Sequence, residues 1–393
     1  MKNLFSKIFL VLLVFSTVLP ASSRDSKIYE RPEEFTGNYD SRANAICLTD
    51  EGLLYIAGYE TEKEEGRNIL MQVNKGFSNP DWSKHYSGEE KKDDEGNGIA
   101  VDFEKSVIVA GYETVKGPKK NILINKWDKN GFTVWTKSIG TEYIADSEAN
   151  GVAADAAGNI YVVGFMSNNN KAPQGWIIKL DKTGKELWQN LYAGGEGEKS
   201  EIKAVTLDTE GKIYVCGYKN IKGKPAEAFV QKLDADGKEL LRIAAQAESK
   251  KEIVFNALAL DTAGNIYTAG YQEVLLNGKD VLVKKFDKNG KELKEITFSG
   301  SARMDDAANG IAVDSDKNIY ICGYTTGEKT RQDGLMIKYS PAGKEVMKRV
   351  QDNYGKNDVY NAICLDADGN IFLAGFAGID SKDTGLWIKQ YSQ

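Results

Sequence analysis

Hydrophobic and polar residues alternate along this chain in short runs that return at a nearly constant interval. Within one interval the pattern predicts four strands, at residues 151–154, 160–165, 176–180 and 186–192. Turns of the type Asp-x-x-Gly at 155–159 and 181–185, and a polar loop at 166–175, separate these strands. Asp offers local backbone hydrogen bonds and Gly tolerates positive φ, so these clusters are typical of tight turns.

The interval is marked by a glycine and an aromatic residue that close the second strand of each copy. These pairs lie at Gly58-Tyr59, Gly111-Tyr112, Gly164-Phe165, Gly217-Tyr218, Gly270-Tyr271, Gly323-Tyr324 and Gly375-Phe376. Adjacent pairs are 53 residues apart five times and 52 apart once. Strands this short need stacked neighbours, so the repeat predicts an all-β, seven-bladed β-propeller of four-stranded blades. The copies start near residues 44, 97, 150, 203, 256, 309 and 361.

The first strand of each copy has one slim and one bulky face. Small residues follow the leading position in all seven copies, and large aliphatic residues come next, as in Gly98 and Ile99 or Gly151 and Val152. Sheets that converge on an axis need this asymmetry, because the innermost strands approach each other closely on one side.

The seventh copy ends after its third strand, so the last blade lacks an outermost strand. We expect residues 27–37 to supply that strand and to close the ring, which makes residues 24–393 one propeller domain. Pro32 is compatible with this role, because an outermost strand can lack a backbone donor. Residues 1–23 are typical of a secretory signal peptide: Lys2 and Lys7 precede an apolar run at 8–18, and small residues follow. The run is short for a membrane anchor, so we expect a secreted, periplasmic or cell-envelope protein with no span in the mature chain.

The string D-x-x-G-N-I-[YF]-x-x-G-[YF] occurs at 155–165, 261–271 and 366–376, after Asn-Gly-Ile-Ala-Val-Asp or close variants. It resembles the bacterial β-propeller repeat (SBBP) family, and the likeness extends over residues 44–393. The resemblance implies the propeller fold and a secreted or surface location, and implies no shared catalytic set. The first, second and fourth copies depart from the pattern, the fourth by carrying Lys203 in place of the leading asparagine.

Composition narrows the classes of function. The net charge of −6 provides no basic surface for nucleic acid, and the chain has a single histidine, His85, on a predicted outermost strand. That position argues against a His-based triad, a multi-His zinc site and the histidine base of the propeller lyases that this chain resembles in repeat style. The four cysteines occupy slots held by small core residues in other copies, so we expect free thiols, with Cys47 and Cys364 as the one pair that ring closure brings near each other.

The loops between one copy and the next are acidic and share a face with the long loops that follow the second strand. This face surrounds one mouth of the channel, and its candidate binding residues are Asn44, Asn97, Asn150, Asn256, Asn309, Asn361, Asp94, Asp146 and Asp305. The asparagines could equally satisfy backbone groups, and the acids could keep edges soluble. We expect no cofactor; the turns at 234–237 and 366–369 carry too few carboxylates for a convincing calcium site.

We therefore predict a monomeric, non-enzymatic scaffold that binds a protein or a glycan through this face. Two alternatives stay open. One is a hydrolase or lyase that works with carboxylates at the channel mouth. The other is an envelope-assembly scaffold that binds proteins by an exposed strand edge.

Overall fold

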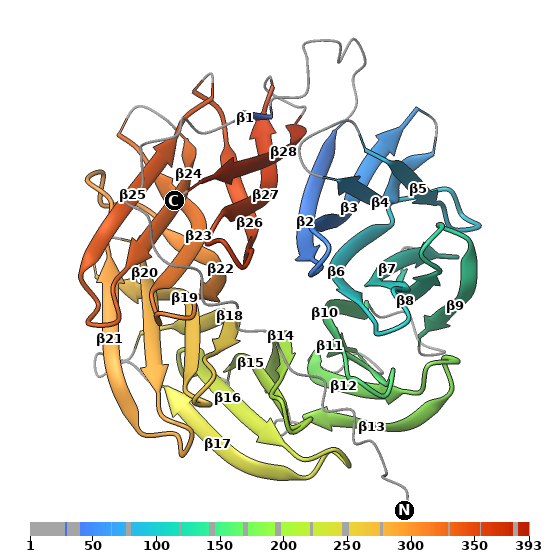
Figure 1. Cartoon of the computed structure of the whole chain (residues 1–393), viewed down its shortest axis with the longest axis horizontal. Coiled ribbons are helices and arrows are strands. Elements are labelled where there is room, and N and C mark those ends of the chain that lie inside the picture. The colour runs from blue at the N-terminus through green and yellow to red at the C-terminus, as the bar shows by residue number, and fades with distance from the viewer. Residues whose placement is uncertain are drawn as a thin grey trace, which may run out of the picture.

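The computed structural model describes residues 28–29, 40–63, 65–75, 80–117, 119–140, 146–167, 172–192, 198–220, 223–245, 251–275, 278–328, 331–353, 355–379 and 384–392. Over these residues the chain forms seven antiparallel sheets arranged as a ring (Figure 1). The predicted seven-bladed propeller is confirmed. The predicted signal peptide, residues 1–23, lies outside the described residues. Within the described ranges, no helix combines the length and apolar character needed to cross a bilayer.

Each blade is built outward from the ring axis in chain order. The innermost strands of blades one to seven are β2 (Ser41–Leu48), β6 (Glu95–Val101), β10 (Glu148–Ala154), β14 (Lys199–Leu207), β18 (Ile253–Leu260), β22 (Ala307–Val313) and β26 (Asp358–Leu365). The second strands are β3 (Leu53–Glu62), β7 (Val107–Val115), β11 (Ile160–Met166), β15 (Ile213–Asn220), β19 (Ile266–Val274), β23 (Ile319–Thr326) and β27 (Ile371–Gly378).

In the outer half of each blade the third strand is largely buried and the outermost strand is largely exposed. The third strands are β4 (Gly66–Lys75), β8 (Lys119–Trp127), β12 (Gln174–Leu180), β16 (Glu227–Leu233), β20 (Gly278–Phe286), β24 (Gln332–Tyr339) and β28 (Thr384–Tyr391). The outermost strands of blades one to six are β5 (Trp82–Tyr86), β9 (Thr133–Ile139), β13 (Glu186–Tyr192), β17 (Glu239–Ala245), β21 (Glu292–Phe298) and β25 (Glu345–Gln351). The hydrophobic core lies between neighbouring sheets, with one cluster at each blade contact.

The outermost strand of blade seven comes from the other end of the chain. β1 (Ile28–Tyr29) pairs with β28, with Ile28 opposite Lys389 and Tyr29 opposite Ile388. The predicted closure is confirmed over these two residues, and the rest of the segment 27–37 lies outside the described residues.

The innermost strands pack as the size pattern predicted. A Cβ added to Gly98 would lie 2.9 Å from the Cα of Gly151 in the next blade, and one added to Gly151 would lie 3.6 Å from the Cα of Ala204. The small residues therefore allow neighbouring backbones to approach, and the large residues fill the other face.

The Asp-x-x-Gly-Asn-Ile-Tyr string is a closed hydrogen-bond unit. In blade three, Asp155 Oδ1 accepts the backbone N–H groups of Ala157 and Asn159, and its Oδ2 accepts the hydroxyl of Tyr161 at 3.0 Å. Gly158 has a φ of +83°, which glycine adopts without strain. The string is thus a turn that its own side-chain hydrogen bonds stabilise, and its repetition reflects a structural role in the blades.

Candidate functional site

The leading asparagines lie where each innermost strand is irregular. In all seven blades the register between the first two strands shifts around this residue, for example between Gly96 and Gly98 around Asn97. A bulge leaves its extra residue out of the ladder and directs its side chain elsewhere. The bulge also explains the glycine of the Gly-aromatic pair, because a Cβ on Gly111 would lie 1.8 Å from the carbonyl oxygen of Glu95.

The freed asparagine side chains link each blade to the next one. Every one of the six donates its amide N–H to the backbone carbonyl that precedes the equivalent position of the following blade. The bonds are Asn44 to Gly96 (3.1 Å), Asn97 to Ala149 (2.9 Å), Asn150 to Ile202 (2.8 Å), Asn256 to Ala308 (2.9 Å), Asn309 to Tyr360 (3.2 Å) and Asn361 to Ala43 (3.0 Å). We call this set the asparagine links; it holds the ring together around the channel.

The link between blades four and five is missing. Lys203 occupies the asparagine position in blade four, and its ammonium lies 2.6 Å from Glu201 Oε1 in its own strand. The equivalent carbonyl in blade five is that of Phe255, which accepts the thiol of Cys216 at 3.9 Å.

Asp94 is fully buried and joins two blades. Its carboxylate accepts the N–H of Gly88 at 2.6 Å and that of Thr114 at 2.8 Å. Burial is the main reason why the pKa of Asp94 rises to about 6, although the two N–H groups oppose that rise. Asp358 occupies the same position in blade seven, with burial again raising its pKa to about 6.

Asp146 and Asp305 are exposed and cap third strands. Asp146 Oδ1 accepts the N–H of Lys120 at 3.1 Å, and Asp305 Oδ1 accepts that of Lys279 at 3.0 Å. These bonds place the inter-blade loops beside the loops after the second strands, as the sequence predicted. The three acids lie at three different blade contacts, so the structure does not bring them together.

Long side chains fill the space above most blade contacts on this face. Between blades one and two, Arg67 lies over the ring of Tyr59, 4.5 Å from its centroid, and forms an ion pair with Glu95 at 2.6 Å. Between blades two and three, Lys120 lies over Tyr112 and pairs with Glu148 at 2.7 Å.

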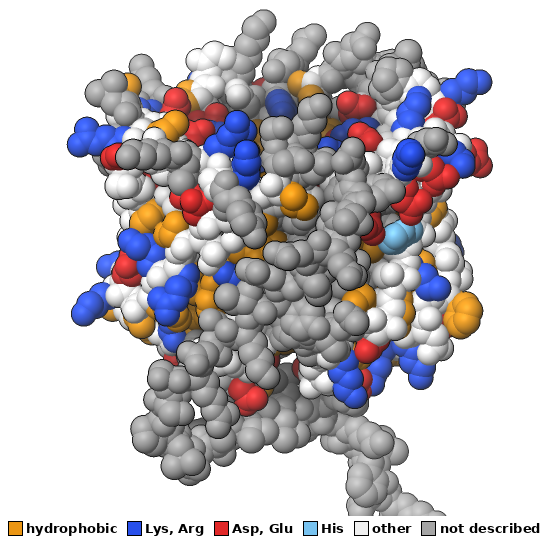
Figure 2. All heavy atoms as spheres, turned by 90° about the horizontal axis from the view of Figure 1, so that it is seen from above, with side chains coloured by type: hydrophobic (Ala, Val, Ile, Leu, Met, Phe, Trp, Pro, Cys, Tyr) orange, Lys and Arg blue, Asp and Glu red, His pale blue; other side chains and the backbone are white. Residues whose placement is uncertain are grey.

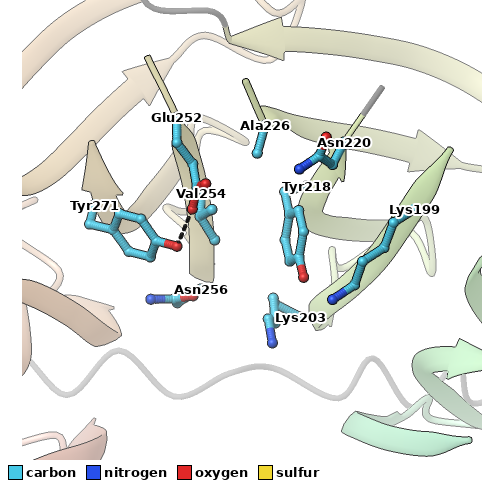
Figure 3. A pocket seen from close by; sticks show the side chains of 9 residues that line it. All are labelled: Lys199, Lys203, Tyr218, Asn220, Ala226, Glu252, Val254, Asn256 and Tyr271. Atoms are coloured by element: carbon cyan, nitrogen blue, oxygen red, sulfur yellow. Dashed lines mark hydrogen bonds between the residues drawn. The ribbon is translucent and has the colours of Figure 1, made fainter. Parts of the chain in front are cut away.

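Blades four and five carry small residues at these positions. Ala226 stands where Arg67 and Lys120 stand, and Val254 stands where Glu95 and Glu148 stand. A cleft of about 380 Å³ results (Figure 3). We call it the blade four-five cleft, and its lining residues are Lys199, Lys203, Tyr218, Asn220, Ala226, Glu252, Val254, Asn256 and Tyr271.

Lys199 is the second cation of the cleft and breaks the repeat for a local reason. Its position holds Asp93, Asp146 and Asp305 in other blades, where the carboxylate caps the N–H of a third strand. Next to Lys199, the residue whose N–H group would be capped is Pro173, and proline has no N–H. The acid is therefore dispensable there. Lys199 is exposed, and its ammonium lies 5.7 Å from the centroid of the Tyr218 ring.

Tyr218 of blade four and Tyr271 of blade five line the cleft, and the strand that carries Glu252 and Val254 lies between them in Figure 3. The hydroxyl of Tyr218 donates to Glu201 Oε2 at 2.8 Å, and that of Tyr271 donates to Glu252 Oε1 at 2.6 Å. Burial, with the nearby carboxylates, raises the pKa of both phenols. Both hydroxyls thus stay protonated in neutral solution.

Glu201, in contrast to the two protonated phenols, is ionised. Burial disfavours its charge, but the ammonium of Lys203 and bonds from Tyr218 and Asn150 keep the pKa of Glu201 below its usual range. Glu201 is therefore ionised beneath the cleft.

The histidine and the cysteines lie away from this cleft. His85 is on β5, the outermost strand of blade one, where its Nδ1 lies 3.0 Å from Glu62 Oε1. Figure 2 shows a histidine, in pale blue, on the rim surface beside acidic side chains. All four cysteines are free, as predicted; Cys216 and Cys322 are buried, and Cys47 and Cys364 are partly buried.

In the two turns considered as calcium sites, the first aspartate accepts hydrogen bonds from backbone N–H groups of the same turn. Asp234 Oδ1 accepts the N–H groups of Asp236 and Lys238, and Asp366 Oδ1 accepts those of Asp368 and Asn370. Across the described ranges, no group of three or more His, Cys, Asp or Glu side chains is arranged to hold a metal ion.

The sequence reasoning identified Lys203 as a departure from the repeat but missed Lys199, Ala226 and the two tyrosines as a group. Comparing every copy position by position, rather than searching for the positions that agree, provides that signal. Lys199 is the single cation at a position that is acidic in five copies and amide in one.

Comparison with known proteins supports the repeat and the fold. Residues 300–328 match the family model described as beta-propeller repeat, SBBP. This stretch is an SBBP repeat. A search of curated proteins gives no match.

Solved structures that match this chain have little sequence in common with it. A polysaccharide lyase of family PL25, an ulvan lyase, is 11% identical with a TM-score of 0.56, and the match covers 91% of this chain and 95% of the lyase. A Dyadobacter fermentans protein of unknown function is 7% identical with a TM-score of 0.53, covering 90% and 94%. The extracellular domain of BT4673 from B. thetaiotaomicron is 13% identical with a TM-score of 0.49; 91% of this chain matches 40% of that one. At these identities the likeness shows the fold alone.

Proposed function

We propose that this chain is a non-enzymatic binding scaffold that recognises a glycan at the blade four-five cleft. The observation that carries the proposal is that two departures from the repeat, Lys199 and Lys203, lie at the one blade contact where Ala226 and Val254 leave an open cleft. In a repeat protein each blade meets the same packing demands, so packing alone does not require two exceptions beside the same cleft. Loops held by a rigid scaffold are also where binding sites usually lie.

The chemistry of the cleft favours a sugar over a protein surface. Its volume falls within the range of about 300 to 1,000 Å³ that is usual for small-ligand sites. Two tyrosine rings provide flat apolar surfaces, while Asn220, Asn256 and Glu252 provide hydrogen-bonding groups at the edges. A hydroxyl-rich ring with an apolar face fits such a lining. A protein ligand, the other class that the sequence allowed, would need a larger contact area.

A carboxylate-based lyase or hydrolase is the second candidate. It is favoured by the shared fold with the ulvan lyase, one structure of which holds -[GlcA(1-4)Rha3S]- and is 11% identical with a TM-score of 0.55. The geometry argues for binding instead. His85 lies on the rim, and the raised pKa values of Tyr218 and Tyr271 keep both phenols protonated at neutral pH. The carboxylates of Asp94, Asp146 and Asp305 lie at separate contacts.

Glycan-array screening of the mature chain tests the proposal, with isothermal titration for each hit. We expect binding that Tyr271→Ala abolishes and that Tyr324→Ala, the equivalent change one blade further on, leaves unchanged. Ultraviolet detection of unsaturated uronide ends in the same samples tests for a lyase. Product formation that Tyr271→Ala removes would replace the binding function by catalysis, and the absence of any glycan ligand would end the proposal.

The location belongs to the same proposal. A glycan-binding role at the cell envelope or outside the cell requires export, for which the apolar segment 8–18 is suited. Fractionation of cells that produce the full chain, with mass measurement of the mature N-terminus, tests this part separately.

A further inference from the structure

We propose that the blade four-five cleft selects an acidic sugar, and that Lys199 and Lys203 bind its anionic group. The inference rests on the proposed glycan-binding function and names the ligand class within it. The anionic group is a carboxylate or a sulfate ester, since both accept hydrogen bonds from ammonium groups.

The first step concerns which charges are already neutralised. Lys203 has one carboxylate partner, Glu201, which is held in its charged form by Tyr218 and Asn150 as well. An ammonium group has three donors, so Lys203 retains donors for a ligand. Lys199 forms no ion pair among the described residues and presents its ammonium at the cleft.

The second step concerns how the two ammonium groups are placed. They lie 5.7 and 5.9 Å from the centroid of the same ring, that of Tyr218 (Figure 3). An anion beside this ring would therefore meet both cations, while the sugar body packs on the tyrosine. In other blades these two positions carry acids or asparagines, and the cation over the equivalent ring comes from the third strand, as with Arg67 and Lys120; the pair of lysines on one innermost strand is particular to this contact.

The third step concerns the opposite wall. Glu252 and Asn256 lie there with Tyr271, and Glu252 has only the Tyr271 hydroxyl as its bonded partner among the described side chains. A carboxylate accepts hydrogen bonds from sugar hydroxyls and repels a second negative charge. The cleft is thus polarised, with cations on the blade four side and acceptors on the blade five side. That arrangement fits a hydroxyl-rich body with one anionic group better than a polyanion such as a nucleotide.

Paired oligosaccharides test the inference. The first pair is a uronic-acid oligosaccharide and the same molecule after carboxyl reduction; the second pair is a sulfated oligosaccharide and its desulfated form. We expect the acidic member of at least one pair to bind about tenfold more tightly, with affinity falling as salt rises. The pair that shows the difference identifies the anionic group as carboxylate or sulfate.

Variants then assign the effect to residues. Lys199→Gln and Lys203→Gln should each lower affinity for the acidic member about tenfold and leave that for its neutral partner within about twofold. Lys344→Gln, an exposed turn lysine on the opposite face, should change neither. Equal affinity for acidic and neutral members, or full affinity in Lys199→Gln, overturns this inference and leaves glycan binding standing. No binding to either member of both pairs, nor to any glycan of the array, overturns the proposed function itself.

Discussion

The contribution of the asparagine links to stability can be tested quantitatively, and Asn97 is the residue we would substitute. Its amide donates to the carbonyl of Ala149 at 2.9 Å, from a half-buried bulge to a fully buried residue of the next blade. Asn97→Ala removes one inter-blade hydrogen bond, which should lower the free energy of unfolding by about 1 kcal/mol. Asn97→Asp keeps the shape but turns the donor into an acceptor facing a carbonyl oxygen, so we expect a loss of about 2 to 3 kcal/mol at neutral pH.

The pH dependence of the aspartate variant separates this explanation from a general packing defect. Protonation gives the carboxyl group an O–H donor, so part of the lost stability should return as pH falls below the pKa of the new group. Equilibrium urea unfolding at several pH values measures this. Asn289→Asp, the same change in an exposed turn, is the matched control. If Asn97→Asp is as stable as the native chain at neutral pH, the links contribute nothing and the reasoning is refuted.

Three further predictions address the cleft, the strand glycines and the buried acids. Lys203→Asn supplies the residue of the other blades, so it should create the missing bond to the Phe255 carbonyl and lower affinity for an acidic glycan about tenfold; titration that shows unchanged affinity would contradict it. Gly323→Ala should destabilise the fold by more than about 3 kcal/mol, because its Cβ would lie 2.0 Å from the carbonyl oxygen of Ala307. Gly151→Ala, whose Cβ has no contact under 3.4 Å, is the control, and equal urea midpoints for the two variants would argue against the clash. Asp94 and Asp358 have pKa values raised from 3.8 to about 6, so the native chain binds protons more tightly than the unfolded chain in that window. Stability should therefore decrease by about 1 to 3 kcal/mol per group as pH rises from about 4 to 6, and Asp94→Asn should flatten the curve; a native curve that rises over this window would refute the assignment.

The fold could be predicted because its causes are local and repeated. The alternation within strands, the Asp-x-x-Gly turns and the small residues on the innermost strands each meet a requirement within one blade or between two neighbouring blades. The same requirement therefore appears in all seven copies of the sequence. The closure by the N-terminal segment could be predicted for the same reason, since a missing strand is visible by counting.

The cleft could not be predicted in the same way, because it depends on residues that meet only in three dimensions. Ala226 and Val254 are unremarkable in their own strands, and only the filled contacts around Arg67 and Lys120 show what they leave empty. The acids were visible in the sequence, yet their roles as caps and buried joints depend on backbone N–H groups of distant loops. Pro173 illustrates the difficulty, since its missing N–H changes what is required of a residue 26 positions away, Lys199.

The asparagine links all point the same way around the ring, each blade donating to its successor, and blade seven donating to blade one. The six hydrogen bonds thus run in one direction around the ring, and the series is interrupted between blades four and five. A ligand in the blade four-five cleft would lie between Lys203 of blade four and Asn256 of blade five, which border that gap, so it would bridge the two blades. Its binding free energy would then add to the stability of the ring, and occupancy and ring rigidity would rise together.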